Sequence, residues 1–495
     1  GSMKRSAMAW LIPCGVALFF MALYGLTAQR GVSWQDSGLY QMRVLTADLR
    51  FVFGLALAHP LYIWMGQHFV GGFAPEQAFF ALNWMSGIGM AVALGVLASV
   101  VLRATKQIWA AVVAALLLGF SQMGWWLSTI AEVYTWSLAF LFVEIAIVLH
   151  ICSVPQQRAG RYWLLLALVN GLHASLHNVA LLHLPIYAAL YLAANRAASL
   201  RKHGVMGVCG AACWLLGAGV LVQLFWREWQ VTHDLAATVR SWLFGYSFEQ
   251  VVLGSGNRVS FQMTLMNWAL AGVSLLNPCW LFIAWSRKPA LVPRFKGVLL
   301  ALTLVHALFW VRYFVPDQAT FVLPTLGLLA VWAGLGYASR TWTIRTHLLV
   351  CALILTCGVG VPLAGAWVLE QTQWVHRSRT LPFREEARYW LIPWKQQEDS
   401  AARFAAAVAE RVRDGDIVFA DNTAAGPLVA SQALGKLPAG VRWVTDYTGE
   451  SVAQQQALMR EKARVFVVSP VPGYAPHAML KEHHFEPDGV LYRVR

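Results

Sequence analysis

The side chain best placed to do chemistry is that of Asp36, which follows the first long hydrophobic stretch of the chain. A carboxylate beside an attacking hydroxyl can act as a general base, because it takes up the proton as the oxygen attacks. Trp34 precedes it by two residues and offers an aromatic face on which a pyranose ring could stack. Acids in loops are more often only solvated, so Asp36 alone does not predict an active site.

Other polar side chains follow or precede later hydrophobic stretches. They are His59, Glu132, Tyr134, His173, His177, Asn178, Tyr313 and Asp317. Each has a simpler explanation by itself. Glu132 could satisfy backbone donors at a helix start, and two histidines spaced i, i+4 on one helical face are more often hydrogen-bonded structure than metal ligands.

Three arginines, Arg240, Arg258 and Arg312, lie near the same places and could bind a phosphate through bidentate guanidinium contacts. Arg312 could instead snorkel to a membrane surface.

The composition shows what must position these residues. Of the 495 residues 58% are hydrophobic and 13% are charged, which predicts an α-helical polytopic membrane protein. A crossing helix needs about 20 apolar residues. Eleven stretches qualify approximately: 9–28, 77–102, 108–125, 132–151, 162–177, 179–194, 205–226, 262–285, 297–312, 321–338 and 347–369.

The charge distribution predicts the orientation. Every second connection is short and basic, from Lys4 and Arg5 before the first span to Arg340 and Arg345 after the tenth. The positive-inside rule then places the N-terminus in the cytoplasm and the C-terminus outside. All the polar residues above fall on the outer side, which is why an assembled site is plausible. The net charge of +14 is explained by these loops, so no nucleic-acid partner is expected.

The seven cysteines lie in spans or cytoplasmic loops, so no disulfide framework is expected. No Cys/His spacing is typical of a zinc site, and we expect neither a metal nor a cofactor.

Three outer regions are large. In region 29–76, Leu39, Met42, Leu45, Leu49 and Val52 recur at helical spacing, which predicts a helix lying in the membrane interface. The second region is 227–261. The third is a tail, 370–495, after a transmembrane catalytic domain of 1–369.

The tail alternates helices and strands, which predicts a small extracytoplasmic α/β domain. Helices are expected at 401–413 and 424–434, with strands at 417–420, 441–447 and 465–469 and a helix between the last two.

Taken together, several short motifs resemble a membrane glycosyltransferase family of the GT-C superfamily. That family includes bacterial envelope proteins and relatives of the eukaryotic protein O-mannosyltransferases. The motifs are Asp36-Ser37-Gly38, Ala58-His59-Pro60-Leu61-Tyr62, Ala131-Glu132-Val133-Tyr134, Gly171-Leu172 through His177, and Val315-Pro316-Asp317-Gln318 through Leu323-Pro324.

The resemblance implies an enzyme of a bacterial inner membrane that takes a sugar from a polyprenyl-phosphate donor at the periplasmic face. It implies an envelope acceptor, which is a protein, lipid or glycan hydroxyl, with Asp36 as the base. The family often has Asp-Ser-Gly-Glu, whereas Leu39 stands at the fourth position here. That departure argues against a paired-carboxylate or metal-binding mechanism.

Two other interpretations stay open. A transporter or flippase of lipid-linked sugars would place ionisable groups near the middle of spans, where Glu144 is the clearest acid. A non-enzymatic scaffold would recruit a partner through the tail and would tolerate replacement of Asp36.

Overall fold

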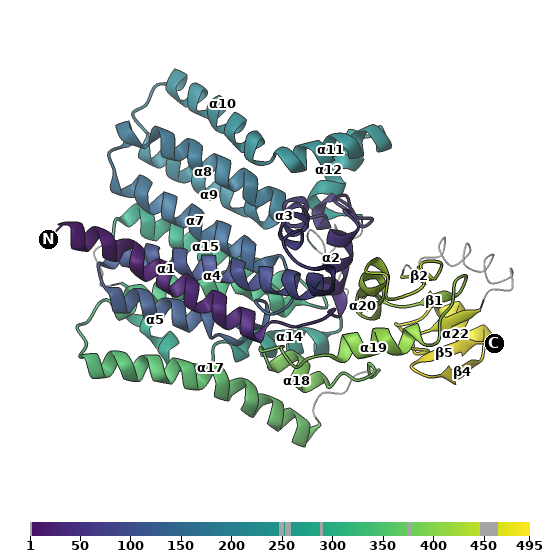
Figure 1. Ribbon diagram of the computed structural model, residues 1–495. Helices are drawn as coiled ribbons and strands as arrows, with labels where there is room; N and C mark the ends of the chain where they lie inside the picture. Colours follow the sequence, from purple (N-terminus) through teal and green to yellow (C-terminus); the bar gives the residue numbers. More distant parts are fainter. Residues whose placement is uncertain (1, 247–251, 253–258, 288–290, 374–378, 446–463) are drawn as a thin grey trace.

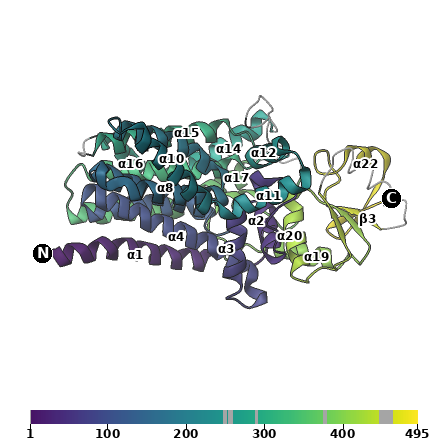
Figure 2. The ribbon, with the colours of Figure 1, turned by 90° about the horizontal axis from the view of Figure 1, so that it is seen from above.

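The computed structural model describes the chain except for residues 1, 247–251, 253–258, 288–290, 374–378 and 446–463. A bundle of long helices carries a small α/β domain at one end (Figure 1). Seen from above, the N-terminus lies at the opposite end of the bundle from that domain (Figure 2).

Helix α4 (Ala78–Thr105) is the centre of the bundle and packs against α1 (Ser2–Thr27), α5 (Ile108–Gly119) and α7 (Tyr134–Ser153). Small residues allow the close approach. A Cβ at Gly87 of α4 would lie 2.6 Å from the Cβ of Tyr24. Glycines at such crossings are typical of membrane helix pairs, which gain stability from backbone proximity rather than from excluding water.

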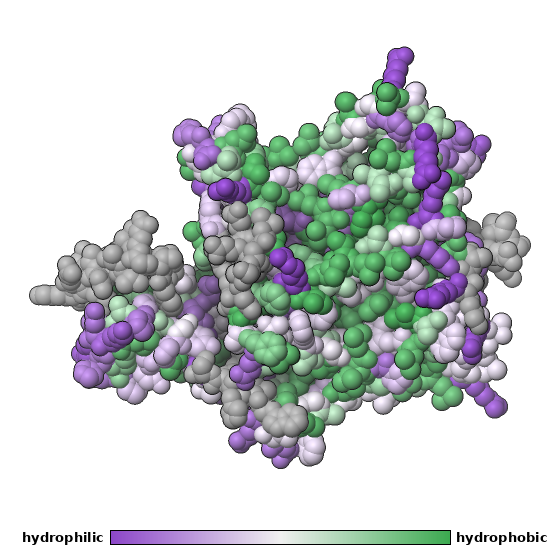
Figure 3. Space-filling model, turned by 180° about the vertical axis from the view of Figure 1, so that it is seen from behind, coloured by the Kyte–Doolittle hydropathy of each residue, from purple (hydrophilic) through white to green (hydrophobic). Residues whose placement is uncertain are grey.

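Further helices complete the bundle. They are α6 (Gln122–Trp126), α8 (Gln156–Leu176), η3 (Asn178–His183), α9 (Leu184–Ala194), α10 (Leu200–Gly217), α11 (Gly219–Thr232), α12 (Leu235–Phe244), α14 (Phe261–Val273), η4 (Pro278–Trp285), α15 (Pro293–Arg312), η5 (Gln318–Val322), α16 (Leu323–Tyr337) and α17 (Ile344–Thr372). Hydrophobic residues cover most of the helical face seen from behind (Figure 3).

The prediction of eleven spans is confirmed only in part. Within the described residues, six helices are long and apolar enough to cross a membrane, or eight if two bent pairs each count as one span. The predicted spans 205–226 and 262–285 are these pairs, bent by 80° and 79°. The second bend falls at Asn277-Pro278, where proline has no N–H to continue a helix.

The predicted interfacial helix is shorter than expected. Helix α2 runs from Gln35 to Leu45 and ends at Thr46, before the positive φ of Ala47. Leu49 and Val52 therefore lie outside it, in the connection to η1 (Leu55–Leu57) and α3 (Pro60–Val70). The short η2 (Pro75–Gln77) then leads into α4.

The predicted α/β tail is present. It comprises α19 (Ser400–Ala409), β1 (Ile417–Phe419), α20 (Asn422–Ala433), β2 (Arg442–Val444), β3 (Val465–Val467), α22 (His477–Glu482), β4 (Phe485–Asp488) and β5 (Leu491–Val494). The sheet order is β2-β1-β3-β5-β4. β1 pairs in parallel with β2 and β3, whereas the β4–β5 hairpin is antiparallel and was not predicted. The helix expected between the strands at 441–447 and 465–469 falls outside the described residues.

The segment before this domain returns to the bundle. Backbone carbonyls in and after α18 (Glu386–Leu391) accept hydrogen bonds from Gln122, Trp126 and Thr129. The backbone N–H of Lys395 donates to the carbonyl of Thr27 at 2.7 Å. The stretch 386–395 is thus packed on the helical part, although the predicted boundary at 370 assigned it to the tail.

Candidate active site

The site is built around a cluster of three carboxylates. Asp36 lies in the first turn of α2, Glu132 precedes α7, and Asp317 precedes η5. Ser37 Oγ donates to Glu132 Oε1 at 3.1 Å, which ties the start of α2 to the loop before α7. The other Glu132 carboxylate oxygen is buried and has no hydrogen-bond partner in the described part of the chain. A substrate hydroxyl is one group that could satisfy it.

Two residues of α4 hold this arrangement. Asn83 Oδ1 accepts from the backbone N–H of Ala131 at 2.9 Å and from Gln41 Nε2 at 3.1 Å, so one amide joins both loops. Ser86 Oγ accepts from the Glu132 backbone N–H at 2.9 Å. Neither Asn83 nor Ser86 was predicted, although a polar residue inside a span is a usable signal.

The environment raises the pKa of all three carboxylates. Burial, and secondly the Asp317 carboxylate, raises the pKa of Asp36 to about 7. Burial raises the pKa of Asp317 to about 6. The pKa of Glu132 is raised well above its usual value by burial and by both aspartates. An aspartate with a pKa near the working pH is well matched to general-base catalysis.

Helix α2 adds two residues to the cluster. Tyr40 and Arg43 follow Asp36 at i+4 and i+7, on the same helical face. Arg43 is fully buried and donates to the carbonyl of Ala58 at 2.6 Å. Burial, followed by the charge of Arg43, lowers the pKa of His59 to about 3, so this imidazole is neutral.

Aromatic rings connect the other predicted residues. The rings of His59 and His177 stack at 4.9 Å between centroids, and Tyr134 lies 5.9 Å from His177. Phe321 contacts both Tyr134 (5.1 Å) and Tyr313 (4.9 Å). The structure therefore brings together side chains from four separate connections of the chain.

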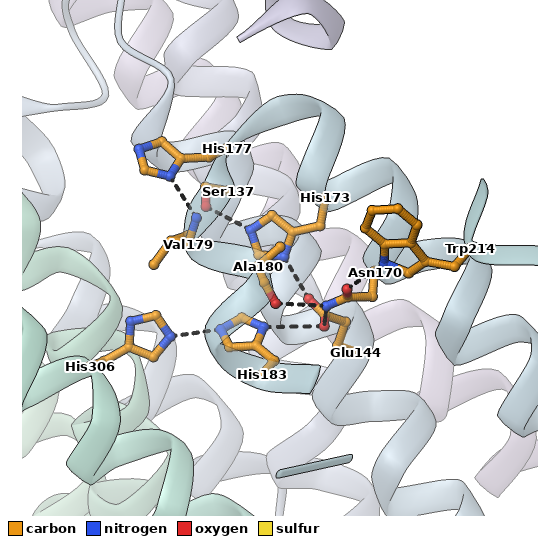
Figure 4. A network of polar contacts seen from close by, with 10 residues as sticks. All are labelled: Ser137, Glu144, Asn170, His173, His177, Val179, Ala180, His183, Trp214 and His306. Atoms are coloured by element: carbon orange, nitrogen blue, oxygen red, sulfur yellow. Dashed lines mark hydrogen bonds and ion pairs between the residues drawn. The ribbon is translucent and has the colours of Figure 1, made fainter. Parts of the chain in front are cut away.

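His173 is not part of this group. Helix α8 ends at Leu176 and His177 has extended backbone angles, so the two histidines do not share one helical face. His173 Nδ1 lies 2.6 Å from Glu144 Oε2, in a buried network of its own (Figure 4). Asn178 is also engaged elsewhere, because its Nδ2 donates to the carbonyl of Trp242 at 2.5 Å.

Trp34 is not available as a sugar platform. Its side chain is 1% exposed, stacks on Phe404 at 5.1 Å and donates from Nε1 to Ser400 Oγ at 2.8 Å. It therefore anchors the α/β domain to the start of α2.

A helix crossing reinforces that anchor. Helix α2 packs on α20 of the α/β domain. A Cβ at Gly38 would lie 2.4 Å from the Gly426 carbonyl carbon, and a Cβ at Gly426 would lie 2.4 Å from the Gln35 carbonyl oxygen. Gln35 itself has a φ of 56°, in the left-handed region that non-glycine residues rarely adopt. The backbone beside Asp36 is thus held in a strained form by a neighbouring domain.

Comparisons with known proteins agree with this picture. Residues 54–200 match the family model described as the Protein O-mannosyl-transferase TMEM260 N-terminal domain. The crystal structure of ArnT from Cupriavidus metallidurans bound to undecaprenyl phosphate is similar, with a TM-score of 0.58 at 10% identity. The match covers 98% of this chain and 97% of that chain. ArnT in the apo state gives a TM-score of 0.59 at 13% identity, over 99% and 98%. No curated protein sequence matches significantly.

Residues 54–200 thus resemble the N-terminal domain of a protein O-mannosyltransferase, and the fold of the whole chain is similar to that of ArnT. The family resemblance seen in the sequence motifs is therefore confirmed. The helical, membrane-spanning architecture with a small C-terminal sheet is confirmed as well.

The three predicted phosphate ligands are less well placed than the acids. Arg312 is exposed and its Nη1 donates to the carbonyl of Val252 at 2.6 Å. Arg240 is exposed on α12. Arg258 lies outside the described residues.

Two buried basic residues, Lys395 and Arg384, were missed by the sequence analysis. Lys395 is 1% exposed and its Nζ donates to the carbonyl of Tyr389, above whose ring it lies at 4.5 Å. Burial lowers the pKa of Lys395 to about 7. Arg384 is 7% exposed and lies 4.0 Å from the same ring. Lys395 lies in the stretch 386–395 that returns to the bundle, and Arg384 lies just before it. No sequence periodicity could have placed this stretch there.

Proposed function

We propose that this protein transfers a sugar from a polyprenyl-phosphate donor to a hydroxyl group of an envelope acceptor. The reaction would take place at the periplasmic face of a bacterial inner membrane. The acceptor is a protein, lipid or glycan. The observation that carries the proposal is the cluster of the buried Glu132 with the half-buried Asp36 and Asp317, located in a fold similar to ArnT.

Asp36 serves as the base. Its carboxylate takes the proton of the acceptor hydroxyl while that oxygen bonds to the anomeric carbon. The bond from the anomeric carbon to the donor phosphate breaks, and polyprenyl phosphate leaves with the electron pair. A single displacement from the face opposite the phosphate inverts the anomeric centre.

The other residues bind rather than react. Glu132, with its unpartnered oxygen, is suited to accept a hydrogen bond from a sugar or acceptor hydroxyl. The other residues proposed to bind substrate in this site are Tyr134, Tyr313, His59, His177 and Asp317. Arg312, with Arg240 and Arg258, is proposed for the donor phosphate, since a guanidinium stabilises the developing charge. The donor itself is suggested by the undecaprenyl phosphate bound to ArnT.

The test is Asp36→Asn, which keeps the size of the side chain and removes the base. We expect transfer to fall by at least about 10²-fold, the usual scale for losing a general base. The readout is mass spectrometry of envelope lipids and proteins from cells that express either form. Asp414→Asn is a matched control, because Asp414 is exposed in the turn between α19 and β1. Normal glycosylation with Asp36→Asn at equal protein levels would contradict the assignment.

A transporter or flippase of lipid-linked sugars is the second candidate. The Glu144 network, inside the bundle, and the two bent helix pairs are features that such proteins use. This function predicts sugar movement that persists in Asp36→Asn, so the same variant separates the two.

A further inference from the structure

A second polar cluster lies inside the helical bundle and takes no part in the proposed reaction. Glu144 of α7, His173 of α8 and His183 of η3 each direct a ligand atom to one point, and these atoms lie within 4.8 Å of one another. All three side chains are at most 1% exposed. Figure 4 shows them converging from three separate elements.

The set of donor atoms is one that transition metals prefer. Glu144 Oε2 is 2.6 Å from His173 Nδ1, and Glu144 Oε1 is 3.2 Å from His183 Nδ1. Two imidazoles and a carboxylate are a recurrent protein ligand set for Zn²⁺. Tetrahedral bonds of about 2.0–2.1 Å separate neighbouring ligand atoms by about 3.3 Å. The contact with His183 already has that spacing, and the contact with His173 would widen.

The Nε2 atom of each imidazole also has a polar partner. His173 Nε2 lies 2.7 Å from Ser137 Oγ, and His183 Nε2 lies 2.8 Å from His306 Nε2. A histidine that binds metal through Nδ1 carries its proton on Nε2 and normally donates it to a second partner. Ser137 and His306 can accept these two protons, so both ligand tautomers would be fixed.

The buried carboxylate of Glu144 would be stabilised by a cation. Glu144 is fully buried, and its ion-pair partners in the described part of the chain are His173 and His183. Asn170 Nδ2 donates to Glu144 Oε1 at 2.8 Å but brings no charge. A carboxylate in an apolar bundle is costly unless a positive charge accompanies it.

We propose that Glu144, His173 and His183 bind one divalent transition-metal ion, Zn²⁺ by preference, with a fourth position left for a non-protein ligand. The ion would join α7, α8 and η3 on both sides of the connection that carries His177 and Asn178. His177 stacks on His59 in the proposed active site, and Asn178 bonds to Trp242 of α12. The proposal does not depend on the transferase function, because the site contains none of the proposed reacting groups.

The test is the metal content of the full-length protein, purified with a histidine-free affinity tag and measured by inductively coupled plasma mass spectrometry. We expect about one Zn²⁺ per chain. Glu144→Gln and His183→Ala should lower it at least about tenfold. His68→Ala is the matched control, since His68 is exposed and outside the cluster.

A second measurement uses only the wild-type protein, so it stays informative if the variants fail to fold. In wild-type protein loaded with Co²⁺, the d–d absorption bands should report nitrogen and oxygen ligands. Wild-type protein with no bound metal, and with an unfolding temperature unmoved by added Zn²⁺, would overturn the proposal. The cluster would then be a hydrogen-bonded carboxylate–imidazole network. Retention of zinc in both ligand variants would overturn it equally.

Discussion

At the scale of single residues, the proposed chemistry depends on two aspartates that influence each other. Asp317→Asn removes one like charge, so the pKa of Asp36 should fall from its value of about 7. Because the base must be deprotonated, the acidic limb of a plot of kcat/KM against pH should move to lower pH. A shift of about one unit is expected for a neighbouring charge.

The measurement is a pH profile of transfer by purified protein. Glu76→Gln, which replaces an exposed acid before α4, should leave the profile unchanged. An acidic limb that stays in place, or moves to higher pH, in Asp317→Asn would show that the two carboxylates do not interact.

Sequence reasoning found many of these residues because they share a position relative to the spans. Asp36, His59, Glu132, His177 and Asp317 all fall at connections on one side, and the structure brings them together. Tyr40 and Arg43 were missed, although their i+4 and i+7 spacing from Asp36 was a usable signal. The predicted role of Trp34 as a sugar platform was wrong, because its ring packs on Phe404. These two residues are 370 positions apart in the sequence, so no local pattern could indicate the contact.

At the scale of elements, the crossing of α2 and α20 determines where Asp36 points. Gly426→Ala would put a Cβ against the Gln35 carbonyl, so one helix must move. Overpacking of this kind lowers the free energy of unfolding by about 1–3 kcal/mol. We expect kcat to fall about tenfold or more, while the unfolding temperature drops by a few degrees.

Gly210→Ala is the matched control, because the Cβ would meet nothing within 4 Å on α10. The kcat and the unfolding temperature of both variants are measured, so that a loss of catalysis can be distinguished from a loss of stability. If kcat is unchanged in Gly426→Ala, then α20 does not position the base. Element boundaries were predictable where a proline or a polar run ends a hydrophobic stretch, but a contact between two glycines leaves no periodic trace in the sequence.

At the scale of the whole molecule, the N-terminus and the α/β domain lie at opposite ends of the bundle (Figure 2). The charge pattern assigns these ends to the cytoplasm and the periplasm. Glu482→Cys in the domain should therefore react with a membrane-impermeant maleimide once the outer membrane is opened. Arg158→Cys, in the first turn of α8, should react only after the inner membrane is permeabilised.

Labelling is read by gel shift against the unsubstituted protein, whose seven cysteines give the background. Equal labelling of both positions in intact inner membranes would contradict the orientation. The orientation in the membrane is easier to predict from the sequence than a side-chain contact is. It depends on charge and hydropathy summed over many residues, so single exceptions matter little.

The docking of the α/β domain has a consequence for how the protein is made. Asp36 emerges early in synthesis, right after the first hydrophobic helix. The residues that contact the backbone and side chains around it, Ser400, Phe404 and Gly426, are translated near the end. Until then α2 lacks the surface that fixes its backbone. We therefore expect the nascent chain to enter the membrane before its proposed base is positioned, and the proposed activity to begin only when the last domain has folded.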